Sequence, residues 1–220
     1  MFTKKLCFVL ASLTLCGCQF QTMEPAIRGS GTMKREARDI QPFDRVNTSG
    51  GTVVEIISGQ QAAGCEVECD DNLLEHLATT VEGGELTIRF VKNISSTEPV
   101  RVWLSTEHLT KLLASGSVQG KVEGLDEPSM ELDVSGSAKL KCVGKAGKLA
   151  IKASGSADFD CLELASDDVT VNISGSGKAN VQANRSLKVD ISGSGSVKYL
   201  GMPEIEKNIS GAGSIAPVEQ

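Results

Sequence analysis

The chain has 220 residues, which is enough for one large domain or two small ones. Only 4% of the residues are aromatic and 23 are glycine, a combination that favours a turn-rich β architecture over a core of large side chains. The formal net charge of -6 disfavours nucleic acid as a partner, because neutralising phosphate groups requires a basic surface.

Residues 1–17 have the pattern of an export signal, in which Lys4 and Lys5 precede an apolar stretch too short to span a bilayer. The sequence "LCGC" that follows resembles a bacterial lipobox, which ends in a small residue and a cysteine. The resemblance implies cleavage before Cys18 and acylation of its sulfur, so the membrane is an expected partner through this lipid anchor. A plain secretory signal with a coincidental cysteine is the alternative.

Residues 18–38 are polar and poor in large apolar side chains, which predicts a flexible tether between the lipid anchor and a single domain at 39–220. Within the tether, "RGSGT" (Arg28 to Thr32) is a candidate start of the first strand. The expected location is the cell envelope, at the outer membrane, and the sequence leaves open whether the domain is periplasmic or faces the cell surface.

The first part of the domain is β-rich but irregular. The stretch "FDRVNTSGGTVVEIISG" (Phe43 to Gly59) predicts a strand, a Ser-Gly bend and a second strand, like a degenerate repeat unit. The stretch "DNLLEHLATTVEGGELTIRF" predicts a short helix at 72–77, with Asp71 as its N-cap, followed by a Gly-Gly hairpin. A further strand is predicted for Val100 to Leu104.

The second part of the domain repeats a hydrophobic-x-hydrophobic-Ser-Gly-Ser pattern, as in "VDISGSGSVKYLG" (Val189 to Gly201). Successive copies begin about 18–20 residues apart, which is the signature of a stacked repeat architecture. The predicted bends are the Ser-Gly pairs Ser115 and Gly116, Ser135 and Gly136, Ser154 and Gly155, Ser174 and Gly175, Ser192 and Gly193, and Ser210 and Gly211.

Around most bends, apolar residues recur one, three and five positions before the serine and three, five and seven positions after it. Such alternation predicts two half-buried strands per unit, joined where the glycine gives the backbone freedom to turn. One unit cannot bury its apolar face alone and must stack on the next. The expected fold is therefore all-β, a single-stranded right-handed parallel β-helix, or β-solenoid, with coils of about 18–20 residues and a less regular N-terminal portion.

Cys142 and Cys161 fall in the same inward column of adjacent repeats. In-register strands lie about 4.8 Å apart, which is within the usual Cα separation of a disulfide, roughly 4.4–6.8 Å. A disulfide and two packed thiols both fit this column. Cys65 and Cys69 would lie about 13 Å apart on one strand face and cannot pair with each other.

No metal or cofactor is expected. A zinc site at Cys65 and Cys69 would need two further cysteine or histidine ligands nearby. The only histidines are His76 and His108, which are interpreted as surface or core residues.

No catalytic residue is expected either. The sequence "GSGKAN" beginning at Gly175 lacks the spacing of a phosphate-binding loop. Many parallel β-helices cleave polysaccharides, and Asp158 and Asp160 are the nearest pair of acids on one face. Their stacked neighbours are Lys139 and Lys141, so an outer ladder of charges explains them without catalysis. No histidine lies within the repeats to activate the serines.

The order of the motifs is similar to that of a known family. The pattern "F..V..SG...V.I..G", then "DNLLE......EGGELTI", then serial "SGSG" units ending in "SGAGSI", resembles the auto-transporter adhesin head domain, or GIN domain, over about residues 40 to 216. The resemblance implies a β-helical fold and an exported lipoprotein of Bacteroidetes-like bacteria. It carries no established catalytic residues to transfer to this chain.

The expected function is that of a non-catalytic cell-envelope lipoprotein, an adhesin head or surface-interaction module whose partner is a glycan or an envelope or host protein. A shortage of aromatic platforms argues against a glycan, since Trp103 and Tyr199 are the only tryptophan and tyrosine. The alternatives are a structural scaffold without a specific ligand and a polysaccharide-active enzyme. The sequence does not fix the oligomeric state.

Overall fold

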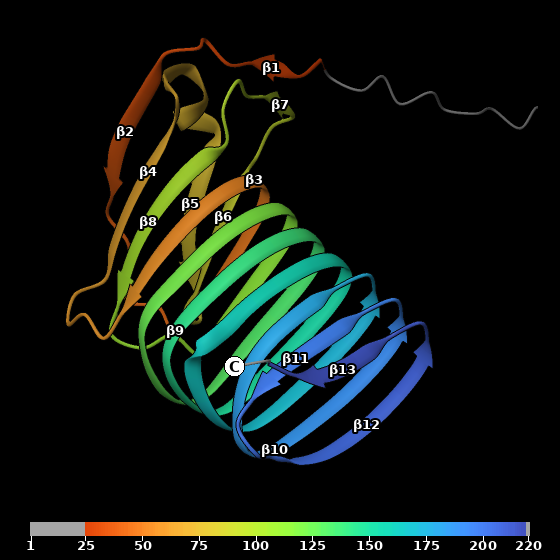
Figure 1. The fold of residues 1–220 in the computed structure, drawn as a ribbon. Coiled ribbons are helices and arrows are strands. Elements are labelled where there is room, and N and C mark those ends of the chain that lie inside the picture. Colours follow the sequence, from red (N-terminus) through yellow and green to blue (C-terminus); the bar gives the residue numbers. More distant parts are fainter. Residues whose placement is uncertain (1–24, 219–220) are drawn as a thin grey trace, which may run out of the picture.

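The computed structural model describes residues 25–218 (Figure 1). With 76% of residues in strands and 3% in helix, the fold is all-β, as predicted. In chain order the elements are β1 (Ile27–Arg28), β2 (Met33–Arg38), β3 (Arg45–Ser58), β4 (Gly64–Asp70), the 3-10 helix η1 (Asp71–His76), β5 (Leu77–Glu82), β6 (Glu85–Phe90), β7 (Ile94–Ser95), β8 (Val100–Thr106), β9 (Lys111–Gly175), β10 (Lys178–Gly193), β11 (Ser196–Leu200), β12 (Glu204–Gly211) and β13 (Ser214–Pro217).

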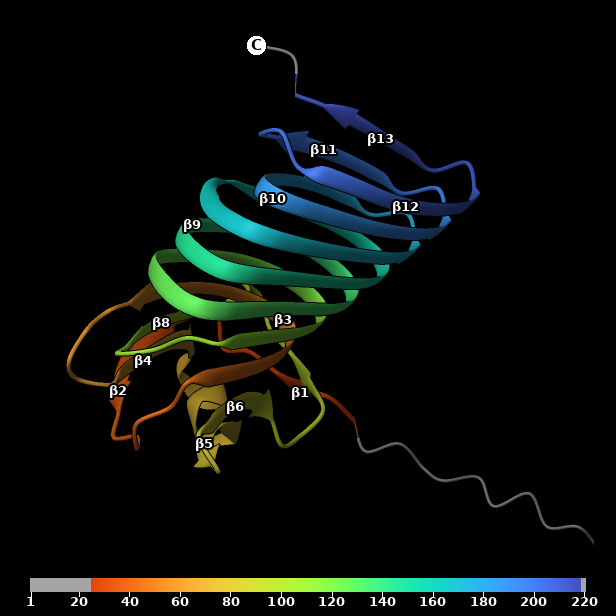
Figure 2. The same ribbon diagram turned by 90° about the horizontal axis from the view of Figure 1, so that it is seen from below.

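The repeats lie side by side in parallel register. Ser192 of β10 pairs with Ser174 of β9 on one side and with Ser210 of β12 on the other. Figures 1 and 2 show the chain turning back on itself in β9 and β10, so that successive turns are stacked one upon the next. The equivalence of the Ser-Gly pairs that the sequence predicts is therefore confirmed as strand register.

The degenerate unit at Phe43 to Gly59 belongs to the same stack. It forms β3, in which Ser49 pairs with Ser115 and Gly50 with Gly116 of β9, although a long irregular segment separates them in the chain. This register makes Ser49 and Gly50 the first members of the column of bends.

The apolar columns predicted to face inward form the core. The residues three positions before the first five repeat serines are fully buried: Leu112, Leu132, Ile151, Val171 and Val189. Ile173 and Ile191 pair with each other and are only 2% and 3% exposed.

Burial falls off in the last turn. Ile205 of β12 is 39% exposed, and Met202 just before this strand is 97% exposed. Among residues 25–218, β12 pairs only with β10, and its other edge has no strand beside it (Figure 2).

The glycines of the bends are also stacked. Gly155 has a φ of 122°, and a Cβ added there would lie 2.5 Å from the carbonyl oxygen of Gly136. The same 2.5 Å approach to the preceding bend glycine recurs at Gly136, Gly175, Gly193 and Gly211. A side chain at any of these five positions would collide with the backbone of the neighbouring turn, which explains why these repeats have glycine after the serine.

The irregular N-terminal portion extends the same sheet. β8 runs parallel to β3, and β4 and β2 follow in antiparallel pairing, which gives a mixed sheet of 11 strands. β5 and β6 form the predicted hairpin across Gly83 and Gly84, both of which have positive φ. The predicted strand at Val100 to Leu104 is present as part of β8.

Two predictions for this portion are wrong in part. The tether does not extend through residue 38, because Met33–Arg38 forms β2, which pairs with β4 over its whole length. The short helix is present at Asp71–His76, but its N-cap is Asp70 rather than Asp71. Residues 25–32 of the predicted tether are also described and include β1, which pairs with β7, whereas residues 18–24 lie outside the described part of the chain.

Asp70 holds the N-terminal segment in place. Its carboxylate is fully buried and accepts hydrogen bonds from the backbone N–H of Gly31 (2.7 Å), the hydroxyl of Ser96 (2.7 Å), and both the hydroxyl (3.0 Å) and the N–H of Thr97 (3.3 Å). Burial by itself raises the pKa of this carboxyl, but the hydrogen bonds outweigh burial and hold the pKa below its usual value of 3.8. The charged form of Asp70 therefore ties the chain before β2 to the chain before β8.

Replacing Asp70 with Asn should destabilise the protein in a pH-dependent way. At pH 7 the loss of charge-assisted hydrogen bonds should cost about 1.5–3 kcal/mol. Because the folded-state pKa of Asp70 is depressed, its contribution is complete above the unfolded-state value and disappears as the pH falls through the folded-state value. The difference in unfolding free energy between wild type and Asp70→Asn, measured by denaturant titration, should thus shrink between pH 5 and pH 2. An equal difference at both ends would contradict this assignment, and the exposed Asp126→Asn is the matched control.

Candidate functional site: a charged groove on the outer sheet

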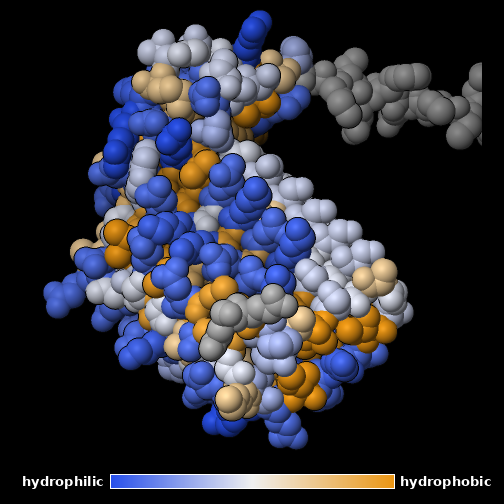
Figure 3. Space-filling view, in the orientation of Figure 1, coloured by the Kyte–Doolittle hydropathy of each residue, from blue (hydrophilic) through white to orange (hydrophobic). Residues whose placement is uncertain are grey.

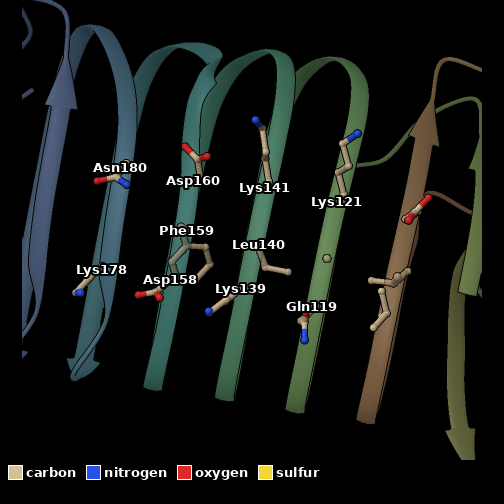
Figure 4. Close-up of a pocket in the computed structure, with 14 residues that line it drawn as sticks. Gln119, Lys121, Lys139, Leu140, Lys141, Asp158, Phe159, Asp160, Lys178 and Asn180 are labelled. Atoms are coloured by element: carbon tan, nitrogen blue, oxygen red, sulfur yellow. The ribbon is translucent and has the colours of Figure 1, made fainter. Parts of the chain in front are cut away.

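A groove of about 490 Å³ runs across β3, β9 and β10 on the outside of the sheet. Two rows of outward side chains border it (Figure 4). The first row, four positions after the bend serines, holds Gln119, Lys139, Asp158 and Lys178. The second row, two positions further along each strand, holds Glu55, Lys121, Lys141, Asp160 and Asn180. Because side chains alternate between the faces of a strand, both rows point to the outside of the sheet.

The floor of the groove lies between the two rows. Leu140 and Phe159 occupy the intervening positions and are 2% and 1% exposed, so they anchor the floor in the core. Next to them Gly120 has no side chain, and a Cβ there would lie 2.5 Å from the Cδ2 atom of Leu140. The side chain of Leu140 thus fills the space beside Gly120 and closes the floor of the groove.

Charge in the groove is almost balanced. Four lysines, Lys121, Lys139, Lys141 and Lys178, face three carboxylates, Glu55, Asp158 and Asp160. Figure 3 shows hydrophilic side chains gathered over the β9 strands on this face. The groove therefore offers alternating donors and acceptors without a strong field of either sign.

Some of these charges have partners outside the rows and some do not. The Nζ atom of Lys141 lies 2.7 Å from Oε1 of Glu163, and the Nζ atom of Lys121 lies 2.9 Å from Oε1 of Glu123. The hydrogen bond and the charge of Glu163 raise the pKa of Lys141. By contrast, Lys139, Asp158 and Lys178 make no ion pair among the described residues. These three side chains are adjacent in the first row and available to a ligand.

The second row continues to the single tryptophan of the chain. Glu55 of β3 pairs with Lys121 on one side and with Trp103 of β8 on the other. A small hollow of about 70 Å³ is lined by Trp103, Glu55 and Lys121, so it shares its border with the groove. The guanidinium of Arg35 lies 3.9 Å from the centre of the Trp103 ring and forms an ion pair with Glu66. Trp103 is thus a fixed aromatic side chain at one end of the groove.

A second hollow, of about 430 Å³, lies over the strand segments that precede the bends. Its lining combines charged and amide side chains with bend serines: Asp133, Lys152, Asn172, Asp190, Asn208, Ser154, Ser174, Ser192 and Ser210. It contains no aromatic residue, and Lys152 is already paired with Glu131 at 2.8 Å. The first groove is consequently the stronger candidate for a binding site.

The sequence-predicted residues fall in different places. Asp158 and Asp160 lie in the groove beside Lys139 and Lys141, as the stacking predicted. The bend residues do not line the groove, and four of the bend serines line the second hollow. Cys18, the predicted lipid attachment site, lies outside the described residues. The place of Trp103 beside the groove could not be predicted from the repeats, because it depends on the register between β8 and β3.

The histidines and acids do not gather into a metal site. His108 contacts Glu127 (3.1 Å) and His76 contacts Glu75 (3.7 Å), in separate parts of the fold. In the described part of the chain no three His, Cys, Asp or Glu side chains are placed to hold a metal ion. Within residues 25–218 no helix is long and apolar enough to cross a bilayer.

All four cysteines of the described chain are free and buried. Cys142 and Cys161 are neighbours in the core, and both their mutual hydrogen bond and burial raise the pKa of Cys161. Burial also raises the pKa of Cys65 and of Cys69 to about 11. These values make the thiols poor nucleophiles, because the thiolate is the reactive form.

We expect these four thiols to resist alkylation by iodoacetamide in the native protein and to react after denaturation without a reductant. Mass spectrometry of the denatured, alkylated domain then distinguishes the two possibilities for Cys142 and Cys161. Labelling of both supports packed thiols, and protection of both until reduction would establish a disulfide. Cys65 and Cys69 serve as the internal control, since they lie on one strand and cannot pair with each other.

The fold and the groove together define a class of protein, an all-β domain of stacked repeats with an extended, polar outer face. Residues 42–203 match the family model described as "Putative auto-transporter adhesin, head GIN domain". The match covers most of the chain, which belongs to this family, and the resemblance noted in the sequence is confirmed. No curated protein matches the chain.

Solved structures share the fold at low sequence identity. A "putative adhesin" from Bacteroides fragilis superposes with a TM-score of 0.70 at 17% identity, covering 88% of this chain and 100% of its own. A "putative adhesin" from Parabacteroides merdae gives 0.58 at 19% identity, covering 88% and 99%. A "Putative lipid binding protein" from Parabacteroides distasonis gives 0.56 at 22% identity, covering 89% and 100%.

Proposed function

We propose that this protein is a non-catalytic surface-interaction module of the cell envelope, an adhesin head held at the membrane by a lipid on Cys18. Its membership in an adhesin head family supports an exported cell-envelope or surface protein. The observation that supports a binding role most directly is the groove, in which Lys139, Asp158 and Lys178 lie in one row without ion-pair partners in the described chain.

We further propose that the stacked turns form a right-handed parallel β-helix. The parallel in-register pairing of β9, β10 and β12 supports this architecture. Such a stack serves adhesion because it presents rows of side chains at a regular interval along a rigid, extended face. A polymeric ligand can then make many weak contacts that add up to useful affinity.

Protease treatment of intact cells tests the surface role. We expect an external protease to cleave this protein while a periplasmic marker protein remains intact. Full protection of the protein on intact cells, with cleavage only after the outer membrane is opened, would refute the adhesin assignment and favour a periplasmic scaffold.

The lipid anchor needs its own test, because residue 18 lies outside the described structure. Mass spectrometry of the wild-type protein should find acyl chains on the N-terminal Cys18, and Cys18→Ala should accumulate as an unacylated precursor. An unchanged lipidated product in Cys18→Ala would refute the site.

A polysaccharide-active enzyme is the competing function, and Asp158 and Asp160 are the carboxylates that would serve it. The proposal expects no release of reducing ends or unsaturated products when the protein is incubated with polysaccharides. Release that is abolished by Asp158→Asn or Asp160→Asn would establish the enzyme instead.

A further inference from the structure

We propose that the groove binds a linear, uncharged glycan that lies across the strands, from the row of Asp158 to Trp103. This inference rests on the proposed surface-interaction function and names the class of its ligand. Three features support this inference: the balanced charge of the groove, the regular spacing of its polar side chains along the stack, and Trp103 at one end.

The balance of charge selects against strongly charged polymers. Lys139 and Lys178 flank Asp158 in the first row, and Glu55 and Asp160 lie in the second row with Lys121 and Lys141. A polyanion such as nucleic acid would meet three carboxylates, and a polycation would meet four lysines. Sugar hydroxyl groups both donate and accept hydrogen bonds, so a neutral glycan can satisfy carboxylates and ammonium groups alike.

The interval of the rows suits a polymer. In the strand register Lys178 lies beside Asp158 and Asn180 beside Asp160, so polar groups recur at each strand along the stack. Neighbouring strands lie about 4.8 Å apart, and the rings of an extended glycan repeat at a similar interval. A chain of several sugars therefore meets an equivalent pair of side chains at each turn.

Trp103 supplies the aromatic surface that sugar rings stack against. It stands in the second row next to Glu55, at the hollow that shares Glu55 and Lys121 with the groove. Arg35 covers the ring on one side and holds it in place. A sugar at this end of the chain would pack against the remaining surface of the indole, an amphipathic contact typical of Trp at binding sites.

The single tryptophan gives the experiment a local reporter. The full chain in mild detergent is titrated with cellohexaose, xylohexaose and mannohexaose, and the fluorescence of Trp103 is followed. We expect a change of fluorescence with at least one neutral hexaose, binding about tenfold tighter than that of the matching disaccharide, and little effect of raising the salt concentration. Hexagalacturonate and single-stranded DNA are the charged comparators.

Variants locate the site. Asp158→Asn and Lys178→Gln should each weaken calorimetrically measured binding several-fold, and Trp103→Ala about tenfold, with partial recovery in Trp103→Phe. Asp190→Asn, in the second hollow and outside the groove, is the matched control and should bind as wild type does. Thermal melting verifies that each variant is folded.

The results that would overturn the inference are separate from those that would overturn the proposed function. Absence of binding to all three neutral hexaoses, tighter binding of hexagalacturonate or DNA, or loss of binding in Asp190→Asn but not in Asp158→Asn would each refute the neutral-glycan groove. A surface-accessible protein would still be an adhesin head in those cases. Conversely, protection from external protease would refute the adhesin role even if the purified protein binds a hexaose.

Discussion

Gly155→Ala should lower the free energy of unfolding by about 2–4 kcal/mol, one of the largest effects expected from a single methyl group in this protein. Two costs combine at this bend. The φ of 122° is strained for any residue with a side chain, and the new Cβ would lie 2.5 Å from the carbonyl oxygen of Gly136 in the neighbouring turn. That contact is with backbone, which cannot move without disturbing the register of the stack.

Two glycines at the bend of β3 separate the cost of backbone strain from the cost of the close contact. Gly50 has a φ of 92° but nothing within 4 Å of an added Cβ, so Gly50→Ala should show backbone strain alone, about 1–2 kcal/mol. Gly51 has neither positive φ nor a close neighbour, so Gly51→Ala should change stability by less than about 1 kcal/mol. Denaturant unfolding followed by circular dichroism gives all three values. If Gly155→Ala costs no more than Gly50→Ala, the bends of adjacent turns are not in contact.

The repeats could be predicted from sequence because one physical constraint recurs at each turn. The serine-glycine pair and the alternating apolar columns are local patterns, and stacking is the only way for such short units to bury them. The register of Ser174 with Ser192 and Ser210 follows directly. The alternating columns also predict core residues such as Ile173 and Ile191, which are buried.

The N-terminal portion was less predictable because its pairings are not periodic. β2 has the sequence "MKREAR", which is highly charged and suggests a solvated tether. It is an edge strand, partly exposed along its length, and it is held by β4 and by the buried carboxylate of Asp70. Nothing in the local sequence distinguishes Asp70 from Asp71, since its partners Gly31, Ser96 and Thr97 are distant in the chain.

The groove could be predicted from the sequence only in part. Its rows in β9 and β10 could be read from the sequence as the positions four and six residues after each bend serine. Trp103 could not be added in the same way, because β8 joins the stack only through β3, which itself pairs with β9 across a long irregular segment. The aromatic side chain beside the groove is therefore supplied by a strand outside the repeats.

Phe159→Ala should be the most destabilising of the core substitutions, by about 3–5 kcal/mol. Phe159 is 1% exposed and is the largest fully buried side chain of the stack. On β10 its strand neighbour is the small Ala179, and two turns away on the other side the same position is Gly120, so there is room for the ring. Its removal leaves a cavity that the in-register backbone cannot close, because the spacing between turns is fixed by the strand hydrogen bonds.

The graded variant Phe159→Leu should cost distinctly less than Phe159→Ala, since it refills part of the cavity. Ile57→Ala, at a side chain that is 48% exposed on the same sheet, is the control and should cost less than about 1 kcal/mol. Equal losses for Phe159→Ala and Ile57→Ala in denaturant unfolding would show that the ring is not enclosed. Because Phe159 lies beneath the groove between Asp158 and Asp160, Phe159→Ala should also weaken binding of a neutral hexaose.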